Sequence, residues 1–367
     1  MALKAGIVGL PNVGKSTLFN AITSSHVEAA NYPFATINPN SGIVEVNDER
    51  VDKLVSLFHP KKIVKATFEF TDIAGLVKGA SKGEGLGNQF LGNIRQCDAI
   101  CHVVRCFENS EIIHVDNTVD PRRDIETINL ELIFADLETV VKRISKVETK
   151  AHTTKEKEAV KEFNVLSKIK KALDNELPAR SVELDEDELL LAKSYNLLTL
   201  KPVIYVANVS EEDYASPSSC SYYQTVKEIA DKEHAECVPI CANIEEELSS
   251  LPEQEKLEYL ESLGVSSTGL DRLVHTSYRL LNLSTFFTVG EDEVRAWTFK
   301  NGMSAPQCAG IIHTDFEKGF IRAEVYSCSD IFEYKTEKAL REAGKIRSEG
   351  KTYLVKDGDC MLIRFNV

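Results

Sequence analysis

The segment Gly9–Thr17 constrains the fold of this 367-residue chain more than any other feature. It fills every fixed position of the pattern G-x-x-x-x-G-K-[ST], in which main-chain amides and a lysine surround phosphate groups. The apolar run 3–8 precedes the segment and the helix-like run 18–22 follows it, so the pattern lies where a strand leads into a helix. The sequence therefore predicts an α/β protein whose first loop binds a nucleoside triphosphate.

Residues within this loop have distinct expected roles. Gly9 and Gly14 allow main-chain N–H groups to close around the phosphate oxygens. Lys15 is expected to contact the β- and γ-phosphates, and the Ser16 hydroxyl group to bind Mg²⁺. An ordinary glycine-rich turn would lack the strand and the helix on either side, so we favour the phosphate-binding interpretation.

The length of the chain indicates two or three domains, and its 43% of apolar residues is enough for a globular fold. We expect the protein to be cytoplasmic. No apolar run reaches the ~20 residues needed to cross a bilayer, and no signal-like segment precedes the first strand, so no membrane partner is expected. The nine cysteines include no C-x-x-C pair, which favours buried reduced thiols over a zinc site or disulfides. A net charge of −14 argues against indiscriminate nucleic-acid binding, and DNA is not expected as a partner.

Alternating apolar and helical runs predict the phosphate-loop fold with a mostly parallel sheet. The apolar runs lie at 43–46, 66–70, 99–106, 202–209 and 237–242. We expect residues 1–119 and 200–282 to form the nucleotide-binding domain.

Two segments depart from the alternating pattern. Asp120 and Pro121 are a good start for a long helix, and a second helix follows the break at 151–154, which predicts an inserted antiparallel helical coiled coil over 120–199. From 283 to 367, short strand-like runs separated by glycine-containing turns predict a small α+β domain.

The predicted insertion carries an excess of basic residues. Ten Lys and Arg residues stand against four Glu residues between Lys142 and Lys171. Two interpretations remain open, a solvated helical face or a surface for RNA or the ribosome. The acidic run 185–188 is interpreted as a solvated helix start rather than a metal site.

A second group of residues is expected beside the phosphates. Asp72 follows the strand-like run 67–70, where phosphate-loop nucleotidases place an acidic residue that acts on Mg²⁺ through water. Gly75 can offer its main-chain N–H to the γ-phosphate. Thr36 lies in a loop that could complete the Mg²⁺ shell when the γ-phosphate is present. Ras-like enzymes have a water-orienting Gln where this chain has Leu76, so intrinsic hydrolysis should be slow unless another group positions the water.

The base-recognition sequence departs from that of the GTPases of this fold. They use N-K-x-D after a later strand, whereas this chain has Asn208, Val209, Ser210 and Glu211 after the run 203–207. A valine replaces the lysine whose stem lines the base, and a longer carboxylate replaces the aspartate that reads guanine. Because adenine offers no hydrogen-bond donor at that edge, the change favours ATP. The dipeptide 241–242 takes the place of the remaining base-contact loop.

Together these residues resemble the YchF subfamily of Obg-like ATPases. The resemblance covers the whole chain, and its tail resembles the β-grasp-like TGS module. The segments that carry it are 9–17, 31–36 with 39–40, 72–91, 208–211, the insertion, 315–323 and 355–359.

The resemblance implies an ATP-preferring enzyme of low intrinsic rate that is cytosolic and associates with ribosomes or ribosomal RNA. Leu76 occupies the position that names the hydrophobic-substituted class. His114, which alone would be read as a surface histidine, matches the proposed catalytic histidine of the family on a flexible loop. Asn12 matches an asparagine with which some relatives hold K⁺ against the phosphates, and Mg²⁺ is implied at Ser16 and Thr36. The implied nucleotide contacts are Asn12, Val13, Gly14, Lys15, Ser16, Thr17 and Val209.

Two other functions remain open from the sequence. One is a GTPase of the same fold. The other is a non-catalytic, nucleotide-gated adaptor for RNA or the ribosome, which Leu76 and the basic insertion favour.

Overall fold

The computed structural model describes residues 3–24, 40–73 and 86–366. Thr36, Gly75 and Leu76, with their expected roles, lie outside these ranges. Contacts divide the chain into two compact units, which are described separately below. The first comprises 1–26, 37–42 and 69–273, and the second comprises 27–36, 43–68 and 274–367.

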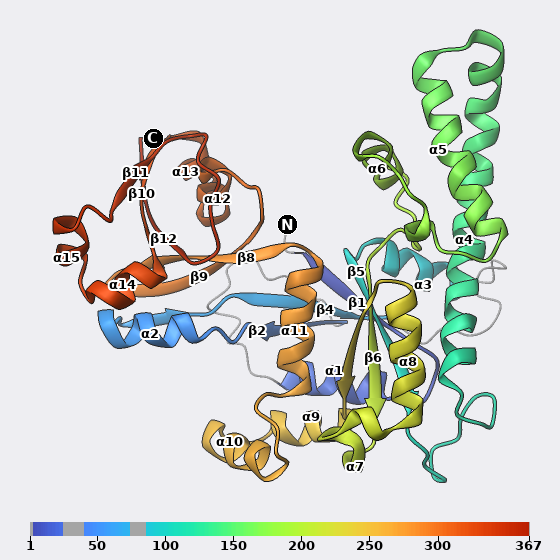
Figure 1. The fold of residues 1–367 in the computed structure, drawn as a ribbon, viewed down its shortest axis with the longest axis horizontal. Coiled ribbons are helices and arrows are strands. Elements are labelled where there is room, and N and C mark those ends of the chain that lie inside the picture. The colour runs from blue at the N-terminus through green and yellow to red at the C-terminus, as the bar shows by residue number, and fades with distance from the viewer. Residues whose placement is uncertain (1–2, 25–39, 74–85, 367) are drawn as a thin grey trace. The chain divides into compact units, whose positions relative to one another are not determined.

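The first sheet has the mostly parallel architecture that the sequence predicts (Figure 1). Its strands, in spatial order, are β2 (Ser41–Glu45), β4 (Thr67–Asp72), β1 (Lys4–Val8), β5 (Ala99–Cys106), β6 (Val203–Val209) and β7 (Glu236–Ile240). The pairs β4–β1, β1–β5, β5–β6 and β6–β7 are all parallel. Every residue of β5 and β6 is buried, as expected for central strands covered on both faces.

Helices connect these strands and cover the sheet. Helix α8 packs on β5, β6 and β7, and α1 packs against α9. Outside the insertion, the helices that begin in the first unit are α1 (Lys15–Ser24), α3 (Leu86–Arg95), α7 (Glu211–Tyr214), α8 (Ser221–Lys232), α9 (Ala242–Ser249), α10 (Glu253–Ser262) and α11 (Gly269–Leu280), with a 3₁₀ turn at Pro217–Ser219. No helix among the residues described is long and apolar enough to cross a membrane.

The helical insertion contains the expected antiparallel pair (Figure 1). Asp120 caps α4 (Pro121–Thr149) by accepting a hydrogen bond from the Arg123 N–H, and Pro121 fits the first turn because it has no N–H to satisfy. A π-helical turn (Lys150–Thr154) leads into α5 (Lys157–Asp174), and a 3₁₀ turn (Ala179–Ser181) precedes α6 (Glu186–Lys193). Buried aliphatic residues of α4, α5 and α6 form a separate hydrophobic cluster.

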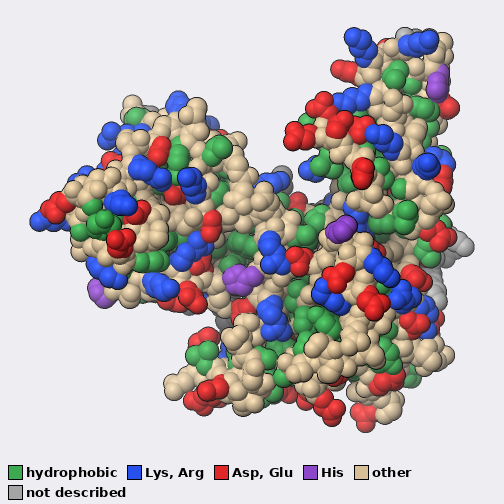
Figure 2. Space-filling view, in the orientation of Figure 1, with side chains coloured by type: hydrophobic (Ala, Val, Ile, Leu, Met, Phe, Trp, Pro, Cys, Tyr) green, Lys and Arg blue, Asp and Glu red, His purple; other side chains and the backbone are tan. Residues whose placement is uncertain are grey.

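Acidic side chains offset much of the basic charge of the insertion. Asp187 and Glu188 of α6 form ion pairs with Lys161 and Lys168 of α5. Further pairs join Arg143 to Glu162, Lys142 to Glu138 and Lys170 to Asp174. On the face drawn in Figure 2, acidic and basic side chains lie next to one another on the insertion. The basic excess counted along 142–171 is therefore smaller in the folded insertion, because the run 185–188 folds back onto it.

The second unit contains a mixed sheet. Its strands, in spatial order, are β11 (Arg347–Glu349), β10 (Phe320–Ser327), β12 (Asp359–Phe365), β8 (Leu283–Val289), β9 (Glu293–Lys300) and β3 (Lys62–Val64). The helices are α2 (Glu49–Phe58), α12 (Ala305–Ile312), α13 (Thr314–Lys318), α14 (Cys328–Tyr334) and α15 (Glu337–Glu342). Phe286, Phe299, Phe320 and Val325 lie in its core.

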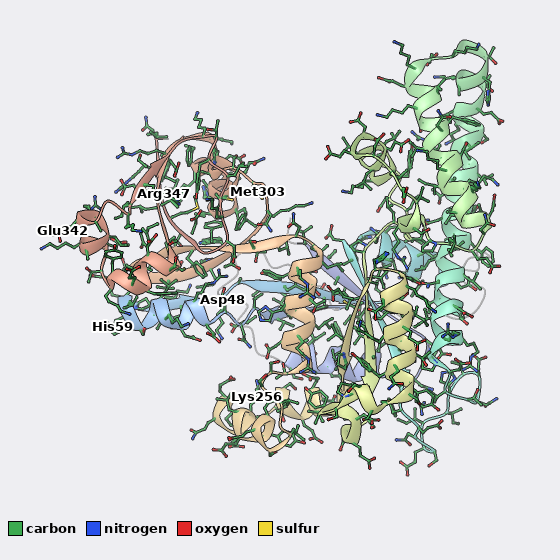
Figure 3. The ribbon with its side chains drawn as sticks, viewed as in Figure 1. Asp48, His59, Lys256, Met303, Glu342 and Arg347 are labelled. Carbon is green, nitrogen blue, oxygen red and sulfur yellow. The ribbon has the colours of Figure 1, made fainter. Side chains whose placement is uncertain are left out.

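The segment 43–68 is grouped with the C-terminal part of the chain, although the sequence placed it in the nucleotide-binding domain. Strand β3 pairs in parallel with β9, and Arg50 of α2 forms an ion pair with Asp357. Figure 3 labels Asp48 and His59 at the two ends of α2. Asp48 caps the helix by accepting from the Arg50 N–H, and His59 ends it in a left-handed conformation.

Candidate functional site

The phosphate loop connects β1 to α1 in a conformation that requires its glycines. A Cβ atom on Gly9 would lie 2.6 Å from the Val103 carbonyl oxygen. Gly14 has φ +96°, and a Cβ atom there would lie 2.2 Å from Nδ2 of Asn208. Both positions therefore exclude a side chain, which leaves the main-chain N–H groups of the loop free to approach phosphate oxygens.

Lys15 is a buried cation at the first position of α1. Its side chain is 8% exposed, and its Nζ donates to the Leu10 carbonyl oxygen over 2.6 Å. Burial lowers the pKa of Lys15 to about 8, although the nearby carboxylate of Asp72 opposes this shift. The ammonium group is still mostly protonated at neutral pH. A buried positive charge with one neutral hydrogen-bond acceptor is well suited to receive an anion.

Asp72 ends β4 close enough to Lys15 for their charges to interact. Burial raises the pKa of Asp72, and the Lys15 charge partly offsets that shift. One carboxylate oxygen, Oδ1, is buried and has no hydrogen-bond partner among the residues described. Ser16 is exposed on the first turn of α1. A buried carboxylate oxygen without a donor, together with a hydroxyl group on the neighbouring loop, fits the hard oxygen ligands that Mg²⁺ prefers.

Asn208 connects three segments of the site. At the end of β6, its Nδ2 donates to the Val13 carbonyl oxygen over 2.9 Å, and its Oδ1 accepts from the Ala242 N–H over 3.0 Å. Val209 is only 1% exposed, whereas Glu211 is exposed at the start of α7. The structure thus brings Asn208 to the phosphate loop, buries the Val209 side chain and leaves the Glu211 side chain accessible.

Replacing Asn208 by alanine should weaken both the fold and nucleotide binding. The substitution leaves the Val13 carbonyl and the Ala242 N–H buried without partners, which should cost about 2 kcal/mol or more in the free energy of unfolding. ATP affinity should fall because the phosphate loop loses its support. Denaturant unfolding and calorimetry check both effects. Asn175→Ala, at the exposed end of α5, is the control, and equal results for the two variants would contradict the role of Asn208.

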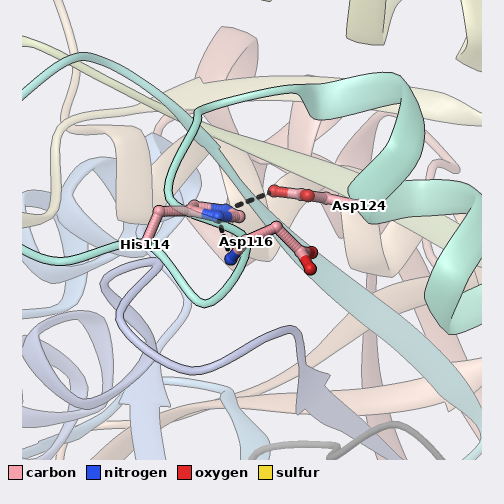
Figure 4. Close-up of side chains that lie close together, drawn as sticks. All are labelled: His114, Asp116 and Asp124. Atoms are coloured by element: carbon pink, nitrogen blue, oxygen red, sulfur yellow. Dashed lines mark hydrogen bonds and ion pairs between the residues drawn. The ribbon is translucent and has the colours of Figure 1, made fainter.

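His114 is buried, so its expected surface placement is wrong. Only 4% of it is exposed. Figure 4 shows the ring between Asp116 and Asp124. Nδ1 accepts a hydrogen bond from the Asp116 N–H over 3.1 Å, so Nε2 carries a proton and donates to Asp124 Oδ2 over 2.8 Å. In this arrangement both ring nitrogens are engaged within the protein.

The side chains of His114, Asp116 and Asp124 offer ligand atoms within 4.8 Å of one another. Arg123 already supplies a positive charge there, because its guanidinium group lies 3.5 Å from Asp116 and 3.1 Å from Asp124. With the guanidinium group in place and both histidine nitrogens occupied, the group is better described as an ion-pair network than as a metal centre.

Asn12 makes a contact that the sequence did not predict. It has φ +61°, and its Nδ2 donates to the Ile113 carbonyl oxygen over 3.0 Å. The phosphate loop is thereby joined to the segment that carries His114. Asp124, the partner of His114, was also missed, and its only sequence signal was an acidic residue in the first turn of a predicted helix.

Three features define the class of this protein: a loop between β1 and α1 that requires glycines, Asp72 at the end of β4, and Asn208 at the end of β6. They are those of a phosphate-loop protein of the GTPase-like class. A family model described as "50S ribosome-binding GTPase" matches residues 4–136. The model YchF-GTPase_C, described as "Protein of unknown function (DUF933)", matches residues 283–366.

Similarity to known proteins extends over the full chain. A Bacillus subtilis (strain 168) protein named "Ribosome-binding ATPase YchF" is 59% identical, and one of the same name from Escherichia coli O157:H7 is 52% identical; each match covers 100% of both chains. A solved structure named "Structure of the Schizosaccharomyces pombe YchF GTPase" matches with a TM-score of 0.89 and 43% identity, over 99% of this chain and 97% of that one. The chain belongs to the YchF family.

Proposed function

We propose that this protein is a cytoplasmic, Mg²⁺-dependent ATPase of low intrinsic rate whose nucleotide state controls its association with ribosomes. The observation that carries the proposal is the buried Lys15 ammonium group beside Asp72, in a loop whose glycines leave the main-chain amides open. The curated relatives that match over the full chain are named ribosome-binding ATPases, which supports the nucleotide and the partner.

Lys15 and the main-chain N–H groups of residues 12–17 hold the triphosphate in this proposal, and Ser16, Thr36 and Asp72 hold Mg²⁺. The ion, when bound, neutralises charge on the phosphate oxygens. Gly75 donates its main-chain N–H to the γ-phosphate. Leu76 cannot orient water, so hydrolysis is slow without help from His114, which must first leave Asp124, or from K⁺ held beside Asn12.

The preference for adenine follows from the segment after β6. Asn208 matches the asparagine of the guanine-binding pattern, whereas Val209 replaces its lysine and Glu211 replaces its aspartate. These two replacements weaken recognition of guanine. We further propose that the insertion (120–199) and the C-terminal domain (283–367) are the parts that contact the ribosome or its RNA.

Direct competition between ATP and GTP for the purified protein tests this function. With Mg²⁺ present, calorimetry should give the lower dissociation constant for ATP. Tighter binding of GTP would support the alternative function, a GTPase of the same fold, in line with the name of the Schizosaccharomyces pombe structure.

Ribosome co-sedimentation with ATP, ADP and no nucleotide should accompany a phosphate-release assay. An ATPase switch predicts both nucleotide-dependent sedimentation and turnover. Nucleotide-dependent sedimentation without turnover would instead identify a non-catalytic adaptor. Association that does not weaken with salt would exclude the basic side chains of the insertion as the main contact.

A further inference from the structure

Arg105 is a buried arginine whose guanidinium group donates to main-chain carbonyl oxygens, and the carboxylates of Glu108 and Asp124 are near enough for their charges to interact with it. It lies near the end of the fully buried strand β5 and is 1% exposed. Its Nε donates to the Phe107 carbonyl oxygen over 3.1 Å, Nη1 to that of Ile112 over 3.0 Å and Nη2 to that of Asn109 over 3.2 Å. Burying a guanidinium group is costly unless its N–H groups are satisfied. All three acceptors belong to the segment that follows β5.

We call that segment, residues 107–117, the strap. It contains no helix or strand; within it, the Ile112 N–H donates to the Asn109 carbonyl and the Asn117 N–H to that of His114. Ile113 is 73% exposed and Val115 is 52% exposed, so these apolar side chains contribute little burial to hold it in place. The hydrogen bonds from Arg105 and the packing of its guanidinium group on the Phe107 ring are therefore the main contacts that hold the strap to β5.

The strap joins Arg105 to the nucleotide site. The Ile113 carbonyl, next to the Ile112 carbonyl that Arg105 holds, accepts the hydrogen bond from Asn12 of the phosphate loop. The next residue, His114, is bonded to Asp124 at the start of α4. Displacement of the strap would therefore disturb both the hydrogen bond to Asn12 and the position of the His114 ring.

We propose that Arg105 is a positioning residue of the nucleotide site, which acts by holding the strap against the phosphate loop. The inference rests on the proposed ATPase function and adds a residue outside the phosphate-binding sequence motif. Arginine suits this role because its planar group directs several N–H donors at fixed angles, whereas lysine presents a point charge. Lysine at this position keeps the charge but cannot reproduce the three-way contact.

The expected effect falls on turnover more than on affinity. In the proposed function Lys15 and the main-chain N–H groups of the phosphate loop hold the triphosphate. Lys15 bonds to Leu10 within that loop, and the strap reaches the loop through the Asn12 side chain. The strap supports the side chain of Asn12 in the phosphate loop and carries His114, and these are the two residues proposed to assist hydrolysis. For Arg105→Lys we expect single-turnover ATP hydrolysis to fall by about 10-fold or more, with the dissociation constant of a non-hydrolysable ATP analogue changed by less than about 3-fold.

Arg180→Lys is the matched control. Arg180 is also largely buried in the same unit, where it pairs with Glu233 and donates to the Thr199 carbonyl, and it contacts no strap residue. Both variants should lose comparable stability, but only Arg105→Lys should slow hydrolysis. Amide hydrogen exchange should accelerate in peptides covering 107–117 in Arg105→Lys and remain at the parent rate in Arg180→Lys.

Unchanged hydrolysis and unchanged strap exchange in a folded Arg105→Lys protein would overturn the inference. If the parent itself does not hydrolyse ATP, the proposed function fails, and the exchange experiment still tests the positioning role. Should Arg105→Lys not fold, Asn12→Gly breaks the other end of the connection at an exposed site where glycine accepts the positive φ. This variant must reproduce the loss of turnover, and parent-like hydrolysis would count against the role of the strap.

Discussion

Replacing Lys15 by methionine is expected to abolish ATP binding while leaving the ligand-free protein at least as stable as the parent. The ammonium group is the one side-chain cation identified in the phosphate loop, and removing one partner from a buried charge pair costs about 3–5 kcal/mol, or more than about 100-fold in affinity. Without a bound anion, the same buried charge lowers the free energy of unfolding. Its pKa is lowered from 10.5 to about 8, which corresponds to roughly 3 kcal/mol of desolvation cost that methionine would not have.

Calorimetry with ATP and Mg²⁺, run beside denaturant unfolding, measures both parts of this result. Lys227→Met on the exposed face of α8 is the control, because Lys227 is exposed and pairs with Asp231 of its own helix. It should leave both quantities at the parent value. Unchanged ATP affinity in Lys15→Met would show that the loop is not the triphosphate site. Lost binding together with a large loss of stability would indicate instead that Lys15 is needed for folding.

The parts of the fold that sequence predicts well depend on local patterns. The phosphate loop is recognisable because all of its fixed residues lie in the short run 9–17, and the central strands because residues 99–106 and 203–209 are almost continuously apolar. The cap at Asp120 also acts within one helical turn. In each case the residues that determine the structure are close together in the chain, so a single sequence contains the necessary information.

The parts that the sequence did not predict depend on contacts between distant segments. No role for Arg105 followed from the sequence, because its acceptors are carbonyl groups that no residue pattern records. His114 read alone would be placed at the surface, because its hydrogen-bond partner Asp124 belongs to a helix assigned to the insertion. The count over 142–171 could not include Asp187 and Glu188, which meet α5 only after the chain turns back. The polarity of neighbouring residues in the sequence does not predict any of these contacts.

Asp136→Ala should destabilise the protein more than Asn208→Ala does, by about 4 kcal/mol relative to the parent. Asp136 is 0% exposed on α4, where Oδ1 accepts from the Leu198 N–H over 2.9 Å and Oδ2 accepts from both the N–H and the hydroxyl group of Thr199 over 2.7 Å. These bonds tie the insertion to the segment that leads into β6. Alanine leaves two buried N–H groups unsatisfied, at about 1–3 kcal/mol each. Urea unfolding measures the loss, with the exposed Asp187→Ala as a control expected to cost below about 1 kcal/mol.

The pH dependence of the free energy of unfolding tests whether Asp136 acts as a buried titrating carboxyl group or only as a well-packed side chain. Burial raises the pKa of Asp136 despite the hydrogen bonds from Thr199 and Leu198, so the folded protein binds this proton more tightly than the unfolded chain does. Its contribution to stability is therefore greatest below the unfolded pKa of about 3.9 and is lost as the pH rises through the higher folded pKa. Asn at position 136 cannot titrate. The stability advantage of the parent over Asp136→Asn should accordingly shrink as the pH rises from about 4 toward neutrality, and a constant difference would mean that the pKa of Asp136 is not raised by folding.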